Sequence, residues 1–320
     1  MLWFYILIFL ICCVLLYFSA EWLISGLTRM TKFLGWREFV VAFIVMAFAA
    51  SLPNLFVGIT SALHKIPQLS FGDVAGNNLV ALTLAVALAV FFAGGSISTE
   101  SRTVQTTSIF TIAAAILPLL LILDGVLGRG DGIILILCFF IYIFWLFSKK
   151  ERFTRVYDEH KLPVATKGFS RFLKDLGKVI LGVIFLFLAA QGIVSSAQFF
   201  AKNFNVSIIL IGVLITGLGS ALPETYFAIA SARRGETWMI LGNLMGAVVV
   251  PATLVLGIVA LICPIEIVDF SPLVIARFFL IISALFFFFF VRTHRKITEK
   301  EAIVLFLIYI FFLITEIILK

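Results

Sequence analysis

Ten long apolar segments, separated by short polar stretches, limit what this chain of 320 residues can fold into. A helix needs about 20 apolar residues to cross the hydrocarbon layer of a membrane, which is about 30 Å thick. Apolar residues make up 62% of the chain and charged residues 13%, whereas soluble domains are about half apolar and about a quarter charged. We therefore expect an all-α membrane protein with ten transmembrane helices, near residues 2–19, 39–63, 70–92, 104–123, 132–147, 179–200, 207–232, 238–261, 273–291 and 303–319.

The basic residues predict how these helices are oriented. When the ten segments are threaded alternately across a membrane, 19 Lys and Arg residues fall on one side and 5 on the other. The side rich in Lys and Arg is normally cytoplasmic. We expect both termini outside, a cytoplasmic central loop at 149–178, and a prokaryotic plasma membrane as the location. Orientation also accounts for the net charge of +7, so a nucleic-acid partner is not expected.

An internal repeat with an offset of 170 residues divides the chain into halves. Residues 50–54, Ala-Ser-Leu-Pro-Asn, align with 220–224, Ser-Ala-Leu-Pro-Glu. Gly-Asp-Val-Ala-Gly at 72–76 aligns in the same register with Gly-Asn-Leu-Met-Gly at 242–246. Equivalent positions are five spans apart, and an odd number of crossings reverses direction. The sequence therefore predicts two five-helix repeats of inverted topology, 1–148 and 179–320.

A proline lies in the middle of one helix of each repeat, at Pro53 and Pro223. Proline removes a backbone hydrogen bond and frees a carbonyl group, which protein, water or an ion must then satisfy inside the membrane. A tolerated kink is the simpler interpretation of one such proline. Two prolines at equivalent positions, each followed by Asn or Glu, favour a substrate site near the membrane midplane, as in other transporters with inverted repeats.

These two regions resemble the α-repeats of the sodium/calcium exchangers in the calcium/cation antiporter superfamily. The motifs that carry the resemblance are Ala-Ser-Leu-Pro-Asn and Ser-Ala-Leu-Pro-Glu, with the Gly-x-x-x-Gly segments that follow them. The α-repeats would span about 39–92 and 207–261. The resemblance implies a secondary antiporter of small cations that needs no cofactor and often works as a monomer. It also implies alternating access, in which the first helix of each half slides past a fixed core of eight helices.

The chain departs from the family pattern where the ions should bind. The family has a glutamate in both repeats, but here the first is Asn54 and only Glu224 remains. Ala81, Ala247 and Pro251 also stand where the family has polar residues. We expect the cation site to be centred on Glu224, with further ligands from Asn54, Ser51, Ser220, Asp73, Asn77 and Asn243.

The number of carboxylates bears on the choice of ion. Calcium takes 6–8 oxygen ligands, and its affinity follows the number of charged ones. With Glu224 as the only carboxylate, a divalent ion would leave uncompensated charge in a medium of low dielectric constant. This predicts a shift towards exchange of a monovalent cation or a proton. Asp73 would supply a second carboxylate if it lay near Glu224, but Asp also caps helix starts, and we favour a cap after Gly72.

Two other functional classes remain to be compared with transport. A non-transporting paralogue that acts as a membrane partner or sensor would explain the lost ligands. An intramembrane enzyme is not expected, because the chain has no HExxH motif and no Gly-x-Ser-x-Gly elbow.

Overall fold

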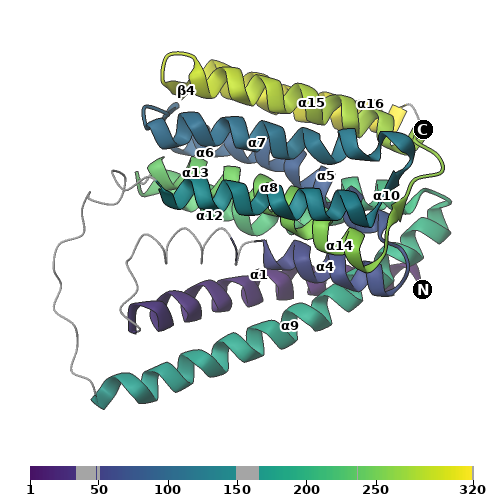
Figure 1. The fold of residues 1–320 in the computed structure, drawn as a ribbon, viewed down its shortest axis with the longest axis horizontal. Coiled ribbons are helices and arrows are strands. Elements are labelled where there is room, and N and C mark those ends of the chain that lie inside the picture. The colour runs from purple at the N-terminus through teal and green to yellow at the C-terminus, as the bar shows by residue number, and fades with distance from the viewer. Residues whose placement is uncertain (34–47, 49–50, 149–165, 236, 319–320) are drawn as a thin grey trace.

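The computed structural model describes residues 1–33, 48, 51–148, 166–235 and 237–318, most of which are helical (Figure 1). Nine helices in these residues are long and apolar enough to cross a membrane. The remaining predicted span, 39–63, lies only in part within the described residues, and its second half forms the shorter apolar helix α4. The chain is therefore an all-α membrane protein.

The first repeat begins with the long helix α1 and continues, after the undescribed residues, with helices joined by short turns. The third span of this repeat is one continuous rod in which a π-helical turn, η2, separates two α-helical parts. The elements are α1 (Leu2–Phe33), α4 (Leu52–Leu63), α5 (Gln68–Val80), η2 (Ala81–Ala85), α6 (Val86–Phe92), β1 (Ser96–Ser98), α7 (Arg102–Leu121), η3 (Ile122–Asp124), β2 (Val126–Leu127) and α8 (Arg129–Ser148).

The second repeat follows the same plan and begins inside the predicted loop. Helix α9 starts at Thr166, so the described part of the predicted loop 149–178 is helical, and residues 149–165 lie outside the described chain. The elements are α9 (Thr166–Phe204), α10 (Ile208–Ile211), η5 (Gly212–Thr216), α11 (Gly217–Ser220), α12 (Leu222–Arg233), α13 (Thr237–Val250), η6 (Pro251–Val255), α14 (Leu256–Ile262), β3 (Ile265–Glu266), α15 (Ser271–Arg292), β4 (Lys296–Thr298) and α16 (Glu299–Ile318).

The boundaries of the elements reproduce the offset of 170 residues. Helix α4 at 52–63 maps onto α12 at 222–233, and α8 at 129–148 maps onto α16 at 299–318. The π-helical turns η2 and η6, at 81–85 and 251–255, also map onto each other. The repeat seen in a few sequence motifs therefore extends to the whole backbone plan.

The pairing of four short strands shows that the repeats are inverted. Strands β1 and β3 are equivalent, as are β2 and β4, yet β1 pairs with β4 and β2 pairs with β3. Helix α15 crosses the membrane between β3 and β4, so these two strands lie at opposite faces. Because β1 is at the same face as β4, the equivalent strands β1 and β3 lie at opposite faces. The prediction of inverted topology is confirmed.

Helices α1 and α9 form a packing unit of their own along one side of the molecule (Figure 1). The ring of Tyr5 stacks on that of Phe199 with their centroids 4.0 Å apart, and Cys12 packs directly against Gly192. Their buried apolar residues form a cluster together with Val57, Leu69 and Ile211, beside the large cluster that joins α5–α8 to α12–α16. This division agrees with the predicted pair of first helices beside a core of eight.

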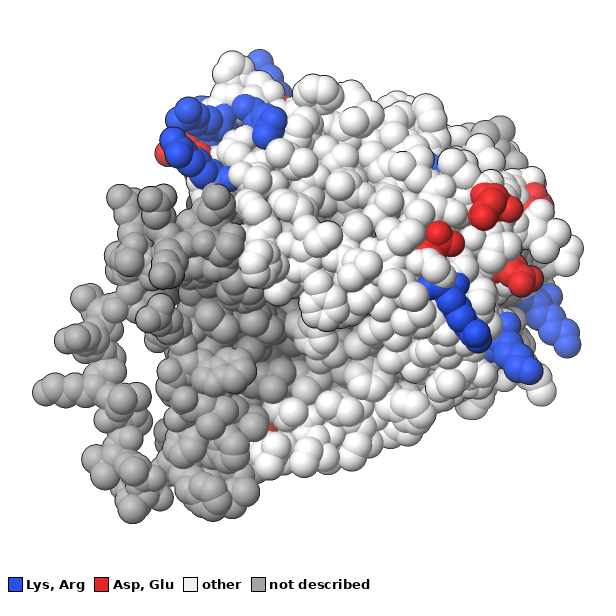
Figure 2. Space-filling model, in the orientation of Figure 1, with Lys and Arg blue, Asp and Glu red and all other residues white. Residues whose placement is uncertain are grey.

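Charged side chains differ between the two membrane faces. Near β4, the exposed side chains Arg292, Lys296 and Lys300 form part of a basic group, which Figure 2 shows at one end of the molecule. Acidic side chains gather at the opposite end in the same view, together with a few basic ones. The exposed acidic residues of the β2–β3 face include Asp124, Glu266 and Asp269.

Candidate cation-binding site

The second helix of the second repeat is interrupted just before its Leu-Pro pair. In the second repeat, α11 ends at Ser220, Ala221 forms a turn, and α12 restarts at Leu222. Pro223 has no N–H group and cannot complete the ladder of backbone hydrogen bonds through the break. In the first repeat, Ser51 occupies the equivalent turn before α4. The predicted helix breaks are therefore present where the structure describes both sides, and they place Ser220 and Glu224 at the junction.

Three of the predicted ligands form one hydrogen-bonded cluster at this junction. The Asn54 Nδ2 atom of α4 donates to Asp73 Oδ2 of α5 and to Ser220 Oγ of α11, each at 3.2 Å. The Ser220 hydroxyl also lies 3.1 Å from Asp73 Oδ1, to which it donates. All three side chains are buried. The cluster joins the two repeats, because Asn54 and Asp73 belong to the first and Ser220 to the second.

The structure contradicts the interpretation of Asp73 as a helix cap. Helix α5 begins at Gln68, and Pro67 occupies its N-cap position. Asp73 therefore lies in the second turn, where the backbone N–H groups already have partners within the helix. The prediction was wrong because Pro67 can start a helix, which moved the first turn to a point before Gly72.

Glu224 supplies a second buried carboxylate next to this cluster. Its side chain is 2% exposed, and neither carboxylate oxygen has a hydrogen-bond partner among the described residues. Glu224 lies four residues beyond Ser220, the residue whose hydroxyl donates to Asp73. The candidate site therefore contains two carboxylates, whereas the prediction of a monovalent cargo assumed only one.

The remaining predicted ligands surround the cluster. Ser51 is buried in the turn that precedes α4. Asn77, one helical turn beyond Asp73, donates to the backbone oxygen of Ala247 at 3.1 Å, while its Oδ1 atom has no partner among the described residues. Asn243 lies on α13, and its Nδ2 atom likewise has no described partner. No described hydrogen bond connects Asn77 or Asn243 to the side chains of the cluster.

Two residues near Asp73 were not among the predicted ligands. Thr216 is close enough to interact with the Asp73 carboxylate, and its position four residues before Ser220 could have indicated that they share a helix face. Cys13 of α1 is buried against Gly219. It brings α1 to the edge of the site, which no sequence spacing indicates.

Glycines hold α5 against the broken helix of the second repeat. A methyl group at Gly72 would overlap the backbone oxygen of Ile209, and one at Gly76 would overlap that of Val213. Only glycine permits such a close approach of two helix backbones. This contact fixes the position of Asp73 relative to Ser220.

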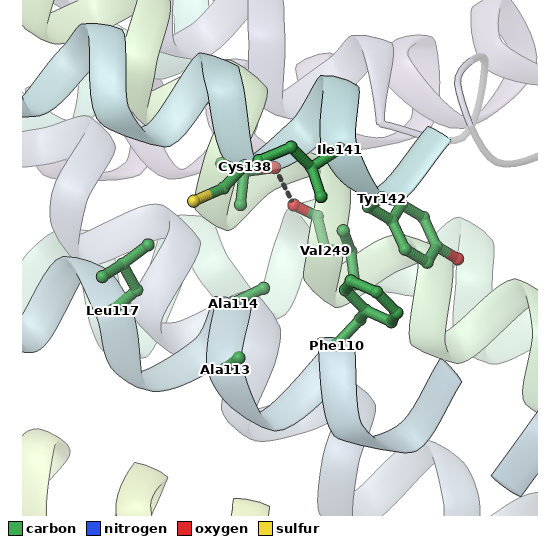
Figure 3. Close-up of a pocket in the computed structure, with 9 residues that line it drawn as sticks. Phe110, Ala113, Ala114, Leu117, Cys138, Ile141, Tyr142 and Val249 are labelled. Atoms are coloured by element: carbon green, nitrogen blue, oxygen red, sulfur yellow. Dashed lines mark hydrogen bonds between the residues drawn. The ribbon is translucent and has the colours of Figure 1, made fainter. Parts of the chain in front are cut away.

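A separate cavity of about 180 Å³ lies between α7, α8 and the junction of α13 with η6 (Figure 3). Its lining is almost entirely apolar, and the hydroxyl of Thr253 is hydrogen-bonded to the backbone oxygen of Val249. None of the predicted ligands lines this cavity. Among the described residues, no three His, Cys, Asp or Glu side chains are grouped closely enough to hold a metal ion, so the two carboxylates would need neutral oxygen ligands beside them.

Comparison with known proteins identifies the family. Residues 4–148 and 175–318 match the model of the family described as sodium/calcium exchanger protein. The inner membrane protein YrbG of Escherichia coli (strain K12) is 25% identical over 261 residues, which cover 79% of this chain and 78% of YrbG. The sodium/calcium exchanger MaX1 of Methanosarcina acetivorans is 23% identical over 96% of this chain and 97% of its own length. A solved structure of the sodium-calcium exchanger NCX_Mj has the same fold, with a TM-score of 0.67 at 22% identity, over 98% of this chain and 99% of that one. The protein belongs to the sodium/calcium exchanger family.

Proposed function

We propose that the protein is a secondary antiporter that binds its cargo cation between Asp73 and Glu224. The family and fold are those of membrane exchangers and not of enzymes. The observation that carries the proposal is the pair of buried carboxylates beside the break between α11 and α12, with Asp73 on α5 of the first repeat and Glu224 on α12 of the second. A buried charge is costly unless a group of opposite charge compensates it, and a transported cation provides that compensation.

The two carboxylates favour a divalent cation as one of the exchanged ions. Together they carry a charge of −2 when ionised, so a Ca²⁺ ion would leave the site neutral. Calcium prefers oxygen ligands, and the side-chain oxygens of Asn54 and Asn77 are buried without a hydrogen-bond partner among the described residues. The prediction of monovalent exchange assumed a single carboxylate, so the reason for it no longer applies. Two Na⁺ ions or two protons would neutralise the same pair, which makes them suitable counter-ions.

Helices α1 and α9 are the elements that we propose to move. Most of their buried apolar residues belong to a cluster beside the larger core, and Cys13 places α1 at the edge of the site. A sliding movement of this pair would open the site alternately to the two membrane faces. The basic β1–β4 face would be cytoplasmic, with both termini outside.

Ion flux in proteoliposomes tests the proposal. We expect purified protein, with Na⁺ loaded inside, to take up Ca²⁺ in exchange, and we would measure uptake of K⁺ and H⁺ in parallel. Vesicles without protein supply the control. Uptake of monovalent ions alone would overturn the divalent assignment and support the prediction of monovalent exchange. Absence of flux for every ion, in folded and inserted protein, would favour the non-transporting paralogue.

A further inference from the structure

The two repeats carry an acid and an amide at the same pair of positions, but in opposite order. With the offset of 170 residues, position 54 corresponds to 224 and position 73 to 243. The second repeat has Glu224 followed by Asn243, whereas the first has Asn54 followed by Asp73. Each repeat therefore contributes one carboxylate and one amide, and only their places differ.

In the first repeat the acid and the amide touch. Asn54 Nδ2 lies 3.2 Å from Asp73 Oδ2, and both side chains are 0% exposed. An exchange of acid and amide between two residues in contact moves the negative charge by about the length of one hydrogen bond. The charge thus stays in the same site although it has changed from one helix to another.

We propose that Asn54 and Asp73 form a transposed acid–amide pair, in which Asp73 supplies the negative charge of the first repeat and Asn54 positions its carboxylate. This inference rests on the proposed function, because it assigns Asp73 to the cation site. It also explains why a chain without a glutamate at position 54 retains two carboxylates.

The surroundings of Asp73 indicate a cation ligand and not a structural ion pair. The groups that interact with its carboxylate are Asn54, Ser220 and Thr216, which are neutral, and the acid Glu224 repels it. None of these groups is basic. With no basic group among these described partners, the charge of the buried carboxylate is compensated when a proton or a metal cation binds.

The two carboxylates differ in how firmly they are held. Both oxygens of Asp73 accept hydrogen bonds, and the neighbouring Gly72 and Gly76 pack α5 against the opposite backbone. The oxygens of Glu224 have no described partner. Asp73 is therefore the positioned ligand of the pair, whereas no described hydrogen bond fixes the Glu224 carboxylate.

A swap of the two side chains tests the inference. N54D/D73N exchanges the acid and the amide without a change in size, while D73N alone removes the charge. We expect D73N to lower Ca²⁺ affinity about a hundredfold, as loss of one partner of a buried charge pair does, and N54D/D73N to return it to within about tenfold of the natural chain. D73N/N203D is the control, because it restores the net charge at the exposed Asn203 and should not rescue.

Two measurements separate this inference from the proposed function. The first is Ca²⁺ flux in proteoliposomes, and the second is the Ca²⁺-dependent rise in melting temperature of the purified protein, which reports binding without transport. A double variant as defective as D73N in both measurements, yet folded, would overturn the inference, as would a D73N variant that binds normally. A natural chain that binds Ca²⁺ without flux would contradict the antiporter alone. A chain stabilised by none of Ca²⁺, Na⁺ and K⁺ would contradict both.

Discussion

Replacement of Glu224 by glutamine should abolish coupled cation flux. Glutamine keeps the size and one carbonyl oxygen of the side chain but removes its charge from a site where Glu224 is buried without a described partner. Removal of one partner of a buried ion pair, here the carboxylate that binds the cation, costs about 3 kcal/mol or more. This corresponds to about a hundredfold weaker cation binding. Uptake of labelled Ca²⁺ by proteoliposomes, measured over a range of concentrations, would show this loss.

Glu266→Gln provides the matched control for this experiment. The substitution is chemically the same, but Glu266 is an exposed residue of β3 at a membrane face. We expect its flux to equal that of the natural chain. Normal flux in Glu224→Gln, or an equal loss in both variants, would show that Glu224 does not bind the cargo.

Substitution of Gly76 by alanine should give the largest loss of stability among conservative changes in the core. The added methyl group would overlap the backbone oxygen of Val213, and a backbone atom of a packed helix cannot move aside as a side chain can. Overpacking of a core costs about 1–3 kcal/mol, and we expect this variant to lie at the upper end. The melting temperature of the detergent-purified protein, followed by size-exclusion chromatography, would reveal the loss.

Gly130→Ala serves as the control for helix glycines. Gly130 lies in the first turn of α8, and a methyl group there would meet no described atom within 4 Å apart from its chain neighbours and the backbone of its own helix. Its melting temperature should stay close to that of the natural chain. If Gly76→Ala were equally stable, the close contact between α5 and η5 would not be what positions Asp73.

The fold was predictable because its main constraint is local. Each span must satisfy its own backbone hydrogen bonds in the membrane, so a run of about 20 apolar residues is enough to predict a helix. The offset between Pro53 and Pro223, together with an odd number of spans, then determined the inversion. The strand pairs β1–β4 and β2–β3 confirmed it but added no new constraint.

The site could be predicted only in part. The residues near the breaks, Asn54, Ser220 and Glu224, follow from the Leu-Pro motifs, because proline marks the interruption in the sequence. Asp73 could be either a cation ligand or a helix cap, and the residues next to it in the sequence did not distinguish the two. Which one applied depended on where α5 begins and on what lies opposite its second turn.

The sequence by itself determined the membrane class, the number of predicted spans, the inverted repeat and the helices that break. These properties depend on hydropathy and on backbone chemistry, both of which can be read from the local sequence. Only the tertiary structure decided that Asp73 meets Asn54 and Ser220, since the residues are 19 and 147 positions from Asp73. Their meeting depends on the glycine-mediated approach of α5 to η5 and α11. The charge of the candidate site comes from carboxylates of both repeats, so it depends on how the repeats pack against each other.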